Sequence, residues 1–393
     1  MNRQSTIVAT LGTAQTLAWA SSYYLPAILA GPMSRDLGVS TPTVFAAFSV
    51  ALIVSALLGP YAGKTIDRLG GRSVLMGSNL AFALGLAGLA HSHGTVGLFA
   101  SWMVIGVGMG TGLYEAAFAS LVRIFGSNSR TAVTGITLIA GFSSTVGWPL
   151  STYLDTQIGW RGACLTWAGL HVLLGLPLNA LLPRMPTQSK VTVETGGDET
   201  AEFPRRSWGT TAALSFVFAA TWFISTAMAT HLPTLLQLSG TSLGTAVMVG
   251  ALIGPAQVGA RLLDFVMLRR VHPLVSARIA AALHPVGVVA LMGLGAPAAA
   301  VFGVLHGAGN GILTIAKGTL PLVFFGPVGY GQRQGVLMIP ARVAQAFAPW
   351  LFGLTLEKWG TGAFWVSAGL SLLAFSALLM LHPGNHRKFA ESQ

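Results

Sequence analysis

The residues of this chain that could do chemistry are a few ionisable side chains set inside long apolar stretches. Only 8% of its 393 residues are charged, yet Glu115, Arg261, Lys317 and Arg342 all lie in such stretches. A charge at the middle of a bilayer costs about 2.5 to 3.5 kcal/mol on insertion scales, so it persists only with a partner or in a wet cavity. Three such cations against one acid predict a positive interior that attracts an organic anion.

Two hypotheses explain Glu115 and Lys317, which the glycine patterns described below place at nearly the same depth. In the first, Lys317 binds an anionic group of a substrate, while Glu115 takes up a proton or competes for the lysine. In the second, the two side chains form a structural or gating salt bridge and touch no substrate. The two roles can coexist. Arg261 and Arg342 lie nearer a helix end, where a long side chain can either face the interior or extend to the head groups.

Amphipathic residues that could form the walls of a small polar pocket surround these charges. Such side chains can both hydrogen-bond a substrate and pack against it. They are Gln15, Trp19, Tyr23, Tyr24, Tyr114, Trp222, His231, His306 and Asn310. The apolar stretches contain no convergent nucleophile, acid pair or metal-ligand set. We therefore expect no catalytic residues, no bound metal and no cofactor, and we predict that the protein is not an enzyme.

About twelve apolar stretches position these side chains, and each is long enough to cross a bilayer as a helix. Hydrophobic residues make up 53% of the chain and its mean hydropathy is +0.67, so too little polar sequence remains to cover a water-soluble fold. The net charge of +11 does not indicate a nucleic-acid binder, because the basic residues lie between apolar spans. The predicted spans are 6–30, 43–62, 73–91, 96–118, 131–153, 162–183, 209–233, 243–263, 274–294, 297–319, 335–356 and 363–382.

A polar insert at 184–208 divides these spans into two sets of six, and its composition is typical of a flexible linker. We predict an N-terminal six-helix bundle at 1–183 and a C-terminal one at 209–393. Basic residues concentrate in cytoplasmic loops. If the N-terminus is cytoplasmic, most of the 22 Lys and Arg residues fall on that side, and only Arg35, Arg161 and Lys358 fall on the other. Both termini are therefore predicted to be cytoplasmic.

The two halves also resemble each other, as expected of a transporter built from repeats. Short matching segments recur in the same order at a nearly constant offset of about 195 to 207 residues. They are Tyr24–Pro26 and His231–Pro233, each closing a predicted span, Gly59–Pro60 and Gly254–Pro255, and the alternating glycines of 106–110 and 307–311. Aligning the glycines places Glu115 opposite Ala316, next to Lys317.

Residues 63–72, between the second and third predicted spans, resemble the signature loop of the major facilitator superfamily. The signature has a glycine, an acid four residues later with a basic neighbour, and then a glycine and a further basic residue. The matching residues are Gly63, Asp67, Arg68, Gly70 and Arg72. An aspartate at a helix end can lie against the positive N-terminus of a neighbouring helix and latch one conformer. By the resemblance, that neighbour is the helix that begins near Arg333.

The resemblance implies an all-α membrane protein with twelve transmembrane helices in two pseudo-symmetric six-helix bundles. It also implies that helices 1, 4, 7 and 10 line a central cavity, which the bundles expose to either side by rocking. The stretch around Gly259 and Arg261 is similar to the eighth helix of monocarboxylate and oxalate carriers in the superfamily, whose arginine meets the substrate carboxylate. In those carriers the acid follows further along the helix than Asp264 does here.

We therefore predict a secondary transporter that moves a small organic anion, a carboxylate, across the inner (plasma) membrane by alternating access, with a proton as the coupling ion. Its expected partners are the small-molecule substrate, protons and the lipid bilayer, with no nucleic acid, and the protein is expected to be a monomer. The first alternative is a proton-driven efflux antiporter for drugs and other amphiphiles. The second is a membrane sensor that binds a ligand without transporting it.

Overall fold

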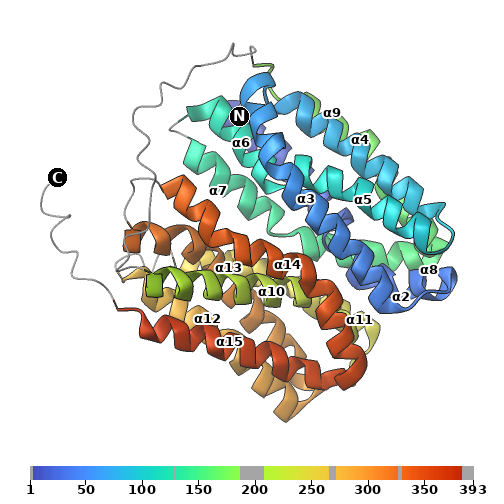
Figure 1. The fold of residues 1–393 in the computed structure, drawn as a ribbon. Coiled ribbons are helices and arrows are strands. Elements are labelled where there is room, and N and C mark those ends of the chain that lie inside the picture. Colours follow the sequence, from blue (N-terminus) through green and yellow to red (C-terminus); the bar gives the residue numbers. More distant parts are fainter. Residues whose placement is uncertain (1–2, 127–128, 186–207, 265–270, 326–329, 383–393) are drawn as a thin grey trace, which may run out of the picture.

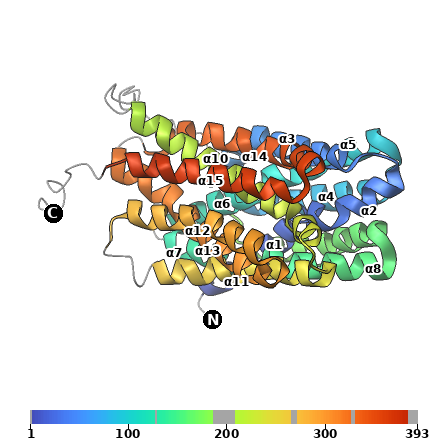
Figure 2. The same ribbon diagram turned by 90° about the horizontal axis from the view of Figure 1, so that it is seen from below.

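The computed structural model describes residues 3–126, 129–185, 208–264, 271–325 and 330–382, and these form helices joined by short turns with no β-strand (Figure 1). The helices run along a common direction, and the ends of the described chain lie at the same end of the molecule (Figures 1 and 2). Long helices that are apolar on most faces bury their backbone polar groups internally, which is what a bilayer requires. The predicted linker at 184–208 falls almost entirely outside the described residues.

The first half of the chain packs as one group of helices. They are α1 Arg3–Ser21, α2 Pro26–Leu37, α3 Thr41–Leu69, α4 Gly71–Ala90, α5 Gly94–Gly112, α6 Tyr114–Phe125, α7 Ser129–Ala140, α8 Ser143–Leu170, a π-helical turn His171–Gly175 and α9 Leu176–Ala180. Helix α5 packs against α3 and α4, and α1 packs against α7 and α8. Small residues allow this close approach, because a Cβ on Gly106 would lie 2.6 Å from the carbonyl oxygen of Ala51.

The second half of the chain repeats this arrangement. Its helices are α10 Trp208–Leu238, α11 Leu243–Leu263, α12 Pro273–Leu294, α13 Ala299–Phe325, α14 Tyr330–Trp359 and α15 Ala363–Met380. Helix α13 packs against α11 and α12, and a Cβ on Gly307 would lie 2.8 Å from the carbonyl oxygen of Ile253. The alternating glycines of the two halves therefore serve the same purpose, which is close contact between two helix backbones.

The fold class predicted from the sequence is confirmed: the protein is an all-α membrane protein. In the described residues, nine helical stretches are long and apolar enough to cross a membrane. Two of them, Thr131–Ala180 and Val336–Met380, each contain two predicted spans. The first breaks at Gly159, whose φ of 71° is non-helical, and the second at a short 3₁₀ turn, Gly360–Gly362. The arrangement is consistent with twelve crossings.

The first predicted span was wrong in its continuity. Residues 6–30 form not one helix but most of α1 and the start of α2, with a break at residues 22–25. Pro26 explains the restart, because a proline fits the first turn of a helix, where its missing N–H costs nothing. Pro233, which was expected to close the seventh span, instead lies inside α10.

The signature segment is also more helical than a loop. Helix α3 continues through residues 63–69, and the chain turns only at Gly70, whose φ of 87° is strained for any residue with a side chain. The side chains of Asp67 and Arg333 lie outside the described part of the chain, so the predicted latch between them stays a prediction.

The two halves meet at the end away from the termini. Trp148 of α8 is only 1% exposed and packs among Met228, Leu232 and Val249 of the second half. The Oγ1 of Thr145 also donates to the carbonyl oxygen of Ala251, at 2.7 Å. The interface between the two halves of the chain is therefore closed at this end of the molecule.

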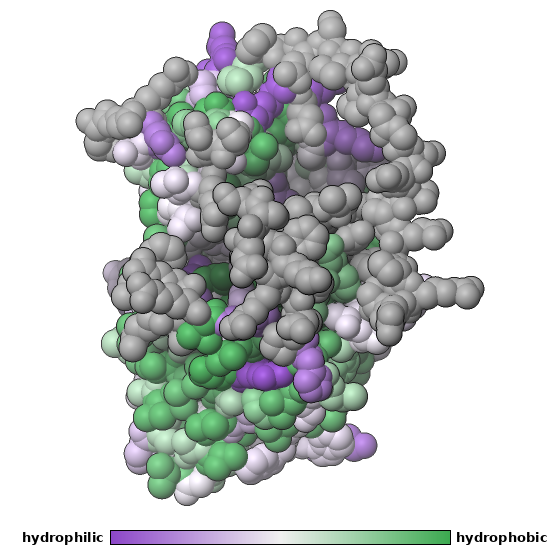
Figure 3. Space-filling model, turned by 90° about the vertical axis from the view of Figure 1, so that its left-hand side faces the viewer, coloured by the Kyte–Doolittle hydropathy of each residue, from purple (hydrophilic) through white to green (hydrophobic). Residues whose placement is uncertain are grey.

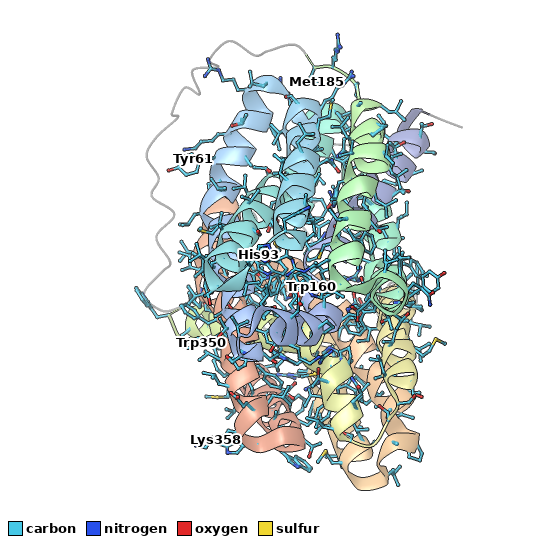
Figure 4. All side chains as sticks on the ribbon, turned by 90° about the vertical axis from the view of Figure 1, so that its right-hand side faces the viewer. Tyr61, His93, Trp160, Met185, Trp350 and Lys358 are labelled. Atoms are coloured by element: carbon cyan, nitrogen blue, oxygen red, sulfur yellow. The ribbon has the colours of Figure 1, made fainter. Side chains whose placement is uncertain are left out.

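The same end is held together within the first half. Arg161 of α8 pairs with Asp36 of α2 at 2.8 Å and donates to the carbonyl oxygens of Ala90 and Ser92. Figure 4 looks onto this end, with Trp160 and His93 near each other. The contacts tie α2 and α8 to the turn between α4 and α5.

Candidate functional site

A cavity of about 1070 Å³ lies between the two halves, and its walls come from both. This volume exceeds the ~300 to 1,000 Å³ typical of small-ligand sites. The lining is contributed by α1, α3, α5, α6 and α7 on one side and by α10, α11, α13 and α14 on the other. Lining residues such as Gly59, Thr131 and Met338 lie in the helix portions nearest the end where the chain begins. Figure 3 looks onto that end, where hydrophilic side chains interrupt the apolar flanks.

Lys317 of α13 is the most deeply placed cation of the cavity. Its side chain is 7% exposed, and Nζ lies 4.0 Å from the centroid of the Trp222 ring of α10. A cation at this distance from an indole face is stabilised by the ring's quadrupole. The contact holds the ammonium group at the cavity wall, where it can meet an anion.

Arg261 of α11 lines the same cavity. Its Nε donates to the carbonyl oxygen of Gly311 at 3.3 Å, and one NH2 group donates to Oε1 of Gln257 at 3.4 Å. Both acceptors are neutral, so they position the guanidinium without neutralising it. Arg261 and Lys317 are close enough for their charges to repel each other. Two cations at one cavity make it attractive to an anion.

Glu115 of α6 contacts Arg342 of α14, and no ion pair joins it to Lys317 in the described residues, so this structure does not show the salt bridge of the second hypothesis. Its Oε1 lies 3.7 Å from an NH2 group of Arg342, and the two side chains are 66% and 43% exposed. The reason is tertiary: α5 ends at Gly112 and α6 begins at Tyr114, which redirects the acid toward α14. The pair joins the two halves across the wet part of the cavity.

Replacing Glu115 with glutamine is expected to lower the free energy of unfolding by less than about 1 kcal/mol, because exposed ion pairs contribute about 0.2 to 1 kcal/mol. The midpoint of thermal unfolding of the purified protein in detergent measures this. Asp36→Asn is the comparison, because Asp36 forms a shorter bridge at 2.8 Å. A larger loss for Glu115→Gln than for Asp36→Asn would show that the pair is not solvated as described.

Aromatic side chains form much of the remaining wall. The ring centroids of Trp19 and Tyr114 lie 4.8 Å apart, and Tyr114 stacks on Phe118 at 5.2 Å with an angle of 12°. Tyr24 lines the cavity beside them. The indole N–H groups of Trp19 and Trp222 have no hydrogen-bond partner in the described residues. Both rings belong to the wall of the cavity.

Ten of the thirteen side chains singled out from the sequence line the cavity: Trp19, Tyr23, Tyr24, Tyr114, Glu115, Trp222, Arg261, Asn310, Lys317 and Arg342. Gln15, His231 and His306 do not line it in this structure. Gln15 is 1% exposed and its amide donates to the carbonyl oxygen of Gly112 at 2.7 Å. His231 is 1% exposed, and its Nε2 lies 2.8 Å from the carbonyl oxygen of Pro349 at the closed end. Both hold backbone in place.

Sequence reasoning missed several polar residues of the wall, namely Ser225, Gln257, Thr314 and Gln345. Helical spacing could have found two of them. Gln257 lies four residues before Arg261 and Gln345 three residues after Arg342, so each shares a helix face with a cation already singled out.

The fold and the cavity together define a multi-pass membrane transporter, with a ligand-sized chamber between two helical halves that is closed at one end. Residues 11–316 match the family described as Major Facilitator Superfamily. The chain belongs to this family. The family prediction is confirmed, and membership indicates a transporter and not an enzyme. The finer resemblance to monocarboxylate and oxalate carriers stays a prediction.

Two relatives and one solved structure extend this comparison. The chain is 27% identical to an "Uncharacterized 38 kDa protein in 23S RNA operon" of Thermoproteus tenax, over 92% of this chain and 91% of the relative. It is 26% identical to a gentisate transporter of Corynebacterium glutamicum, over 89% of this chain and 82% of the relative. The crystal structure of a D-xylose-proton symporter has the same fold, with a TM-score of 0.74, 15% identity, and coverage of 97% of this chain and 98% of the symporter.

Proposed function

We propose that this protein transports a small organic carboxylate that carries an aromatic ring, by alternating access and with a proton as the coupling ion. The observation that carries the proposal is the shared placement of Lys317 and Arg261 in one cavity whose walls are rich in aromatic rings. Its membrane is proposed to be the inner membrane, with both termini cytoplasmic. The cavity then faces the cytoplasm.

The anionic character of the substrate follows from the charges. Glu115 of the cavity wall contacts Arg342, while Arg261 and Lys317 line the same cavity, Arg261 with its guanidinium donating to neutral acceptors and Lys317 with its ammonium over the ring of Trp222. A carboxylate in this cavity can accept hydrogen bonds from both cations. A lipophilic cation would be repelled by the same set.

The aromatic ring of the substrate follows from the walls. Offset and edge contacts between aromatic rings contribute about 0.5 to 1.5 kcal/mol beyond the burial of their area. Trp19, Tyr24, Tyr114 and Phe118 offer such contacts on the side of the cavity that faces the two cations. The relative in Corynebacterium glutamicum is described as a gentisate transporter, and gentisate combines a ring with a carboxylate.

Transport requires the closed end to open and the cavity end to close. We propose that residues 1–183 and 209–393 move as the two bundles of this exchange, with the segment between them as the linker. The contacts of Trp148 and Thr145 with α11 would then break in each cycle, and Glu115 and Arg342 would lie on the surfaces that approach each other.

Counterflow of labelled gentisate in proteoliposomes tests the proposal. Vesicles loaded with unlabelled gentisate are expected to take up the label transiently, while protein-free liposomes are not. Benzoate in the outer medium should compete, and the lipophilic cation tetraphenylphosphonium should not. Label uptake that the cation inhibits and benzoate does not would favour the efflux alternative. Saturable binding without exchange would favour the sensor.

A further inference from the structure

Two buried histidines lie against each other outside the central cavity. His284 of α12 and His306 of α13 are 5% and 4% exposed, and their Nδ1 atoms are 3.0 Å apart. The Nε2 of His284 lies 3.0 Å from Oγ of Ser367 in α15. The pair therefore links three helices of the second half of the chain.

The hydrogen bonds decide where the protons are. Oγ of Ser367 lies 2.8 Å from the carbonyl oxygen of Phe364, which can only accept, so the hydroxyl donates there and accepts from Nε2–H of His284. A neutral imidazole carries one N–H, so Nδ1 of His284 is an acceptor. Nδ1–H of His306 then donates to it. This leaves Nε2 of His306 without a proton.

The free lone pair of His306 has access to a small polar space. In the described part of the chain, Nε2 of His306 has no hydrogen-bond partner, and the residue lines a cavity of about 20 Å³. That volume holds about one water molecule. Ser225 and Asn310 line both this cavity and the central one, so a wall of two polar side chains separates them.

One neighbouring ring can stabilise a positive charge on His306, and no described group that faces the pair carries a negative charge. The ring of Phe302 lies parallel to that of His306, with centroids 5.8 Å apart, which suits a cation. The groups facing the pair are neutral: Thr221 and Ser225 of α10, Asn310 of α13, and Ser367 and Ser371 of α15. Arg278 of α12 donates instead to the carbonyl oxygens of Leu378 and Leu381.

The histidine pair and the anion-binding cation share one helix. Asn310 and Lys317 follow His306 by four and eleven residues, about one and three helical turns, so all three lie on one face of α13. An anion bound at Lys317 adds a negative charge to the same group of helices. That charge favours a proton on His306, and the proton in turn favours the anion.

We propose that the His284–His306 pair is the site that takes up the coupling proton, which binds at the lone pair of Nε2 of His306. The proposal rests on the proposed function, because it assigns the proton of the anion carrier. A hydronium ion in the small cavity gives its proton to Nε2 and leaves as water, and the imidazolium returns the proton after the bundles have moved. One proton with one monovalent anion moves no net charge.

His306→Asn tests this assignment, because an asparagine amide can still donate to Nδ1 of His284 but offers no basic nitrogen. In proteoliposomes with labelled gentisate, a pH difference of about two units can drive about 100-fold accumulation by the wild type. The variant is expected to accumulate none and to keep the counterflow exchange of the wild type. Retained exchange shows that the variant is folded. Accumulation by His306→Asn equal to wild type would overturn the proposal.

Two comparison variants sharpen the result. His171→Asn changes a histidine of the first half that is fully buried and stacked on Phe82, with both nitrogens hydrogen-bonded, and it should accumulate normally. Glu115→Gln changes the competing proton acceptor. Loss of accumulation in Glu115→Gln, with full accumulation in His306→Asn, would overturn the histidine assignment in favour of the carboxylate.

A measurement without substrate separates this proposal from the proposed function. Wild-type protein that exchanges no gentisate overturns the substrate class alone. Solid-state NMR of protein with ¹⁵N-labelled histidine then reports the protons directly. The expected tautomers are Nε2–H on His284 and Nδ1–H on His306, with His306 gaining a second proton as the pH is lowered. A pair that gains no proton down to about pH 4 would overturn the assignment whatever the substrate is.

Discussion

Lys317→Ala is expected to abolish gentisate transport while the protein still inserts and folds. A charge-assisted hydrogen bond is worth about 1.5 to 3 kcal/mol, so its loss weakens anion binding by about 10- to 100-fold. The substitution also removes the contact between Nζ of Lys317 and the ring of Trp222, whose centroid lies 4.0 Å away. Counterflow rates measure the loss of transport. The shift in thermal midpoint on adding gentisate measures the loss of anion binding.

Lys358→Ala is the matched control for this prediction. Lys358 also lies over a tryptophan, with Nζ 5.7 Å from the ring centroid of Trp359, but it is exposed at the closed end and does not line the cavity. It should transport as the wild type does. Unchanged uptake kinetics in Lys317→Ala would rule out a substrate role for Lys317, and equal losses in both variants would point to a general effect of removing a lysine.

Gly250→Leu is expected to reduce exchange to the background of protein-free liposomes. A Cβ on Gly250 would overlap the ring of Trp148, which inserts from α8 into the second half of the chain. Trp148 is fixed by its own indole N–H, which donates to the carbonyl oxygen of Tyr24 at 3.1 Å. The ring cannot retreat without opening the closed end. Alternating access then stops, because the cavity can no longer open toward the end of the molecule where the termini lie.

Thiol labelling distinguishes this arrest from unfolding. With Cys164 replaced by alanine, a cysteine at Val247, which is 4% exposed on α11, should be unreactive alone and alkylated when Gly250→Leu is added. Gly259→Leu is the control on the same helix, because a Cβ there has no neighbour within 4 Å. It should exchange normally. Exchange by Gly250→Leu near the wild-type rate would show that the Trp148 contact does not close the carrier.

Local sequence patterns were sufficient to predict the architecture, because the surrounding lipid dictates the hydropathy of each helix. A lipid-facing helix must be apolar over about 20 residues, so the twelve stretches were visible in composition alone. The alternating glycines predicted close helix contacts, and Gly106 and Gly307 both approach a neighbouring backbone. The chain turns at Gly70, a glycine of the signature segment, because its φ of 87° suits only a glycine.

The sequence left open which side chains contact one another in the folded protein. The break between α1 and α2 is local, yet Pro26 and Pro233 occupy matching positions and only the first begins a new helix. Gln15 and His231 looked like binding residues because both are polar within a span. Each instead hydrogen-bonds a backbone carbonyl in a distant helix, of Gly112 and of Pro349, which no spacing along the chain reveals.

The sequence by itself determined that this protein is a helical membrane transporter with a cationic interior, because hydropathy, the signature segment and the few charges in the spans are properties of the linear chain. The tertiary structure decided which charges meet. It brought Glu115 to Arg342 and Lys317 to Trp222, and it paired His284 with His306. These contacts depend on how helices far apart in sequence rotate and cross, and packing of the whole molecule sets that geometry.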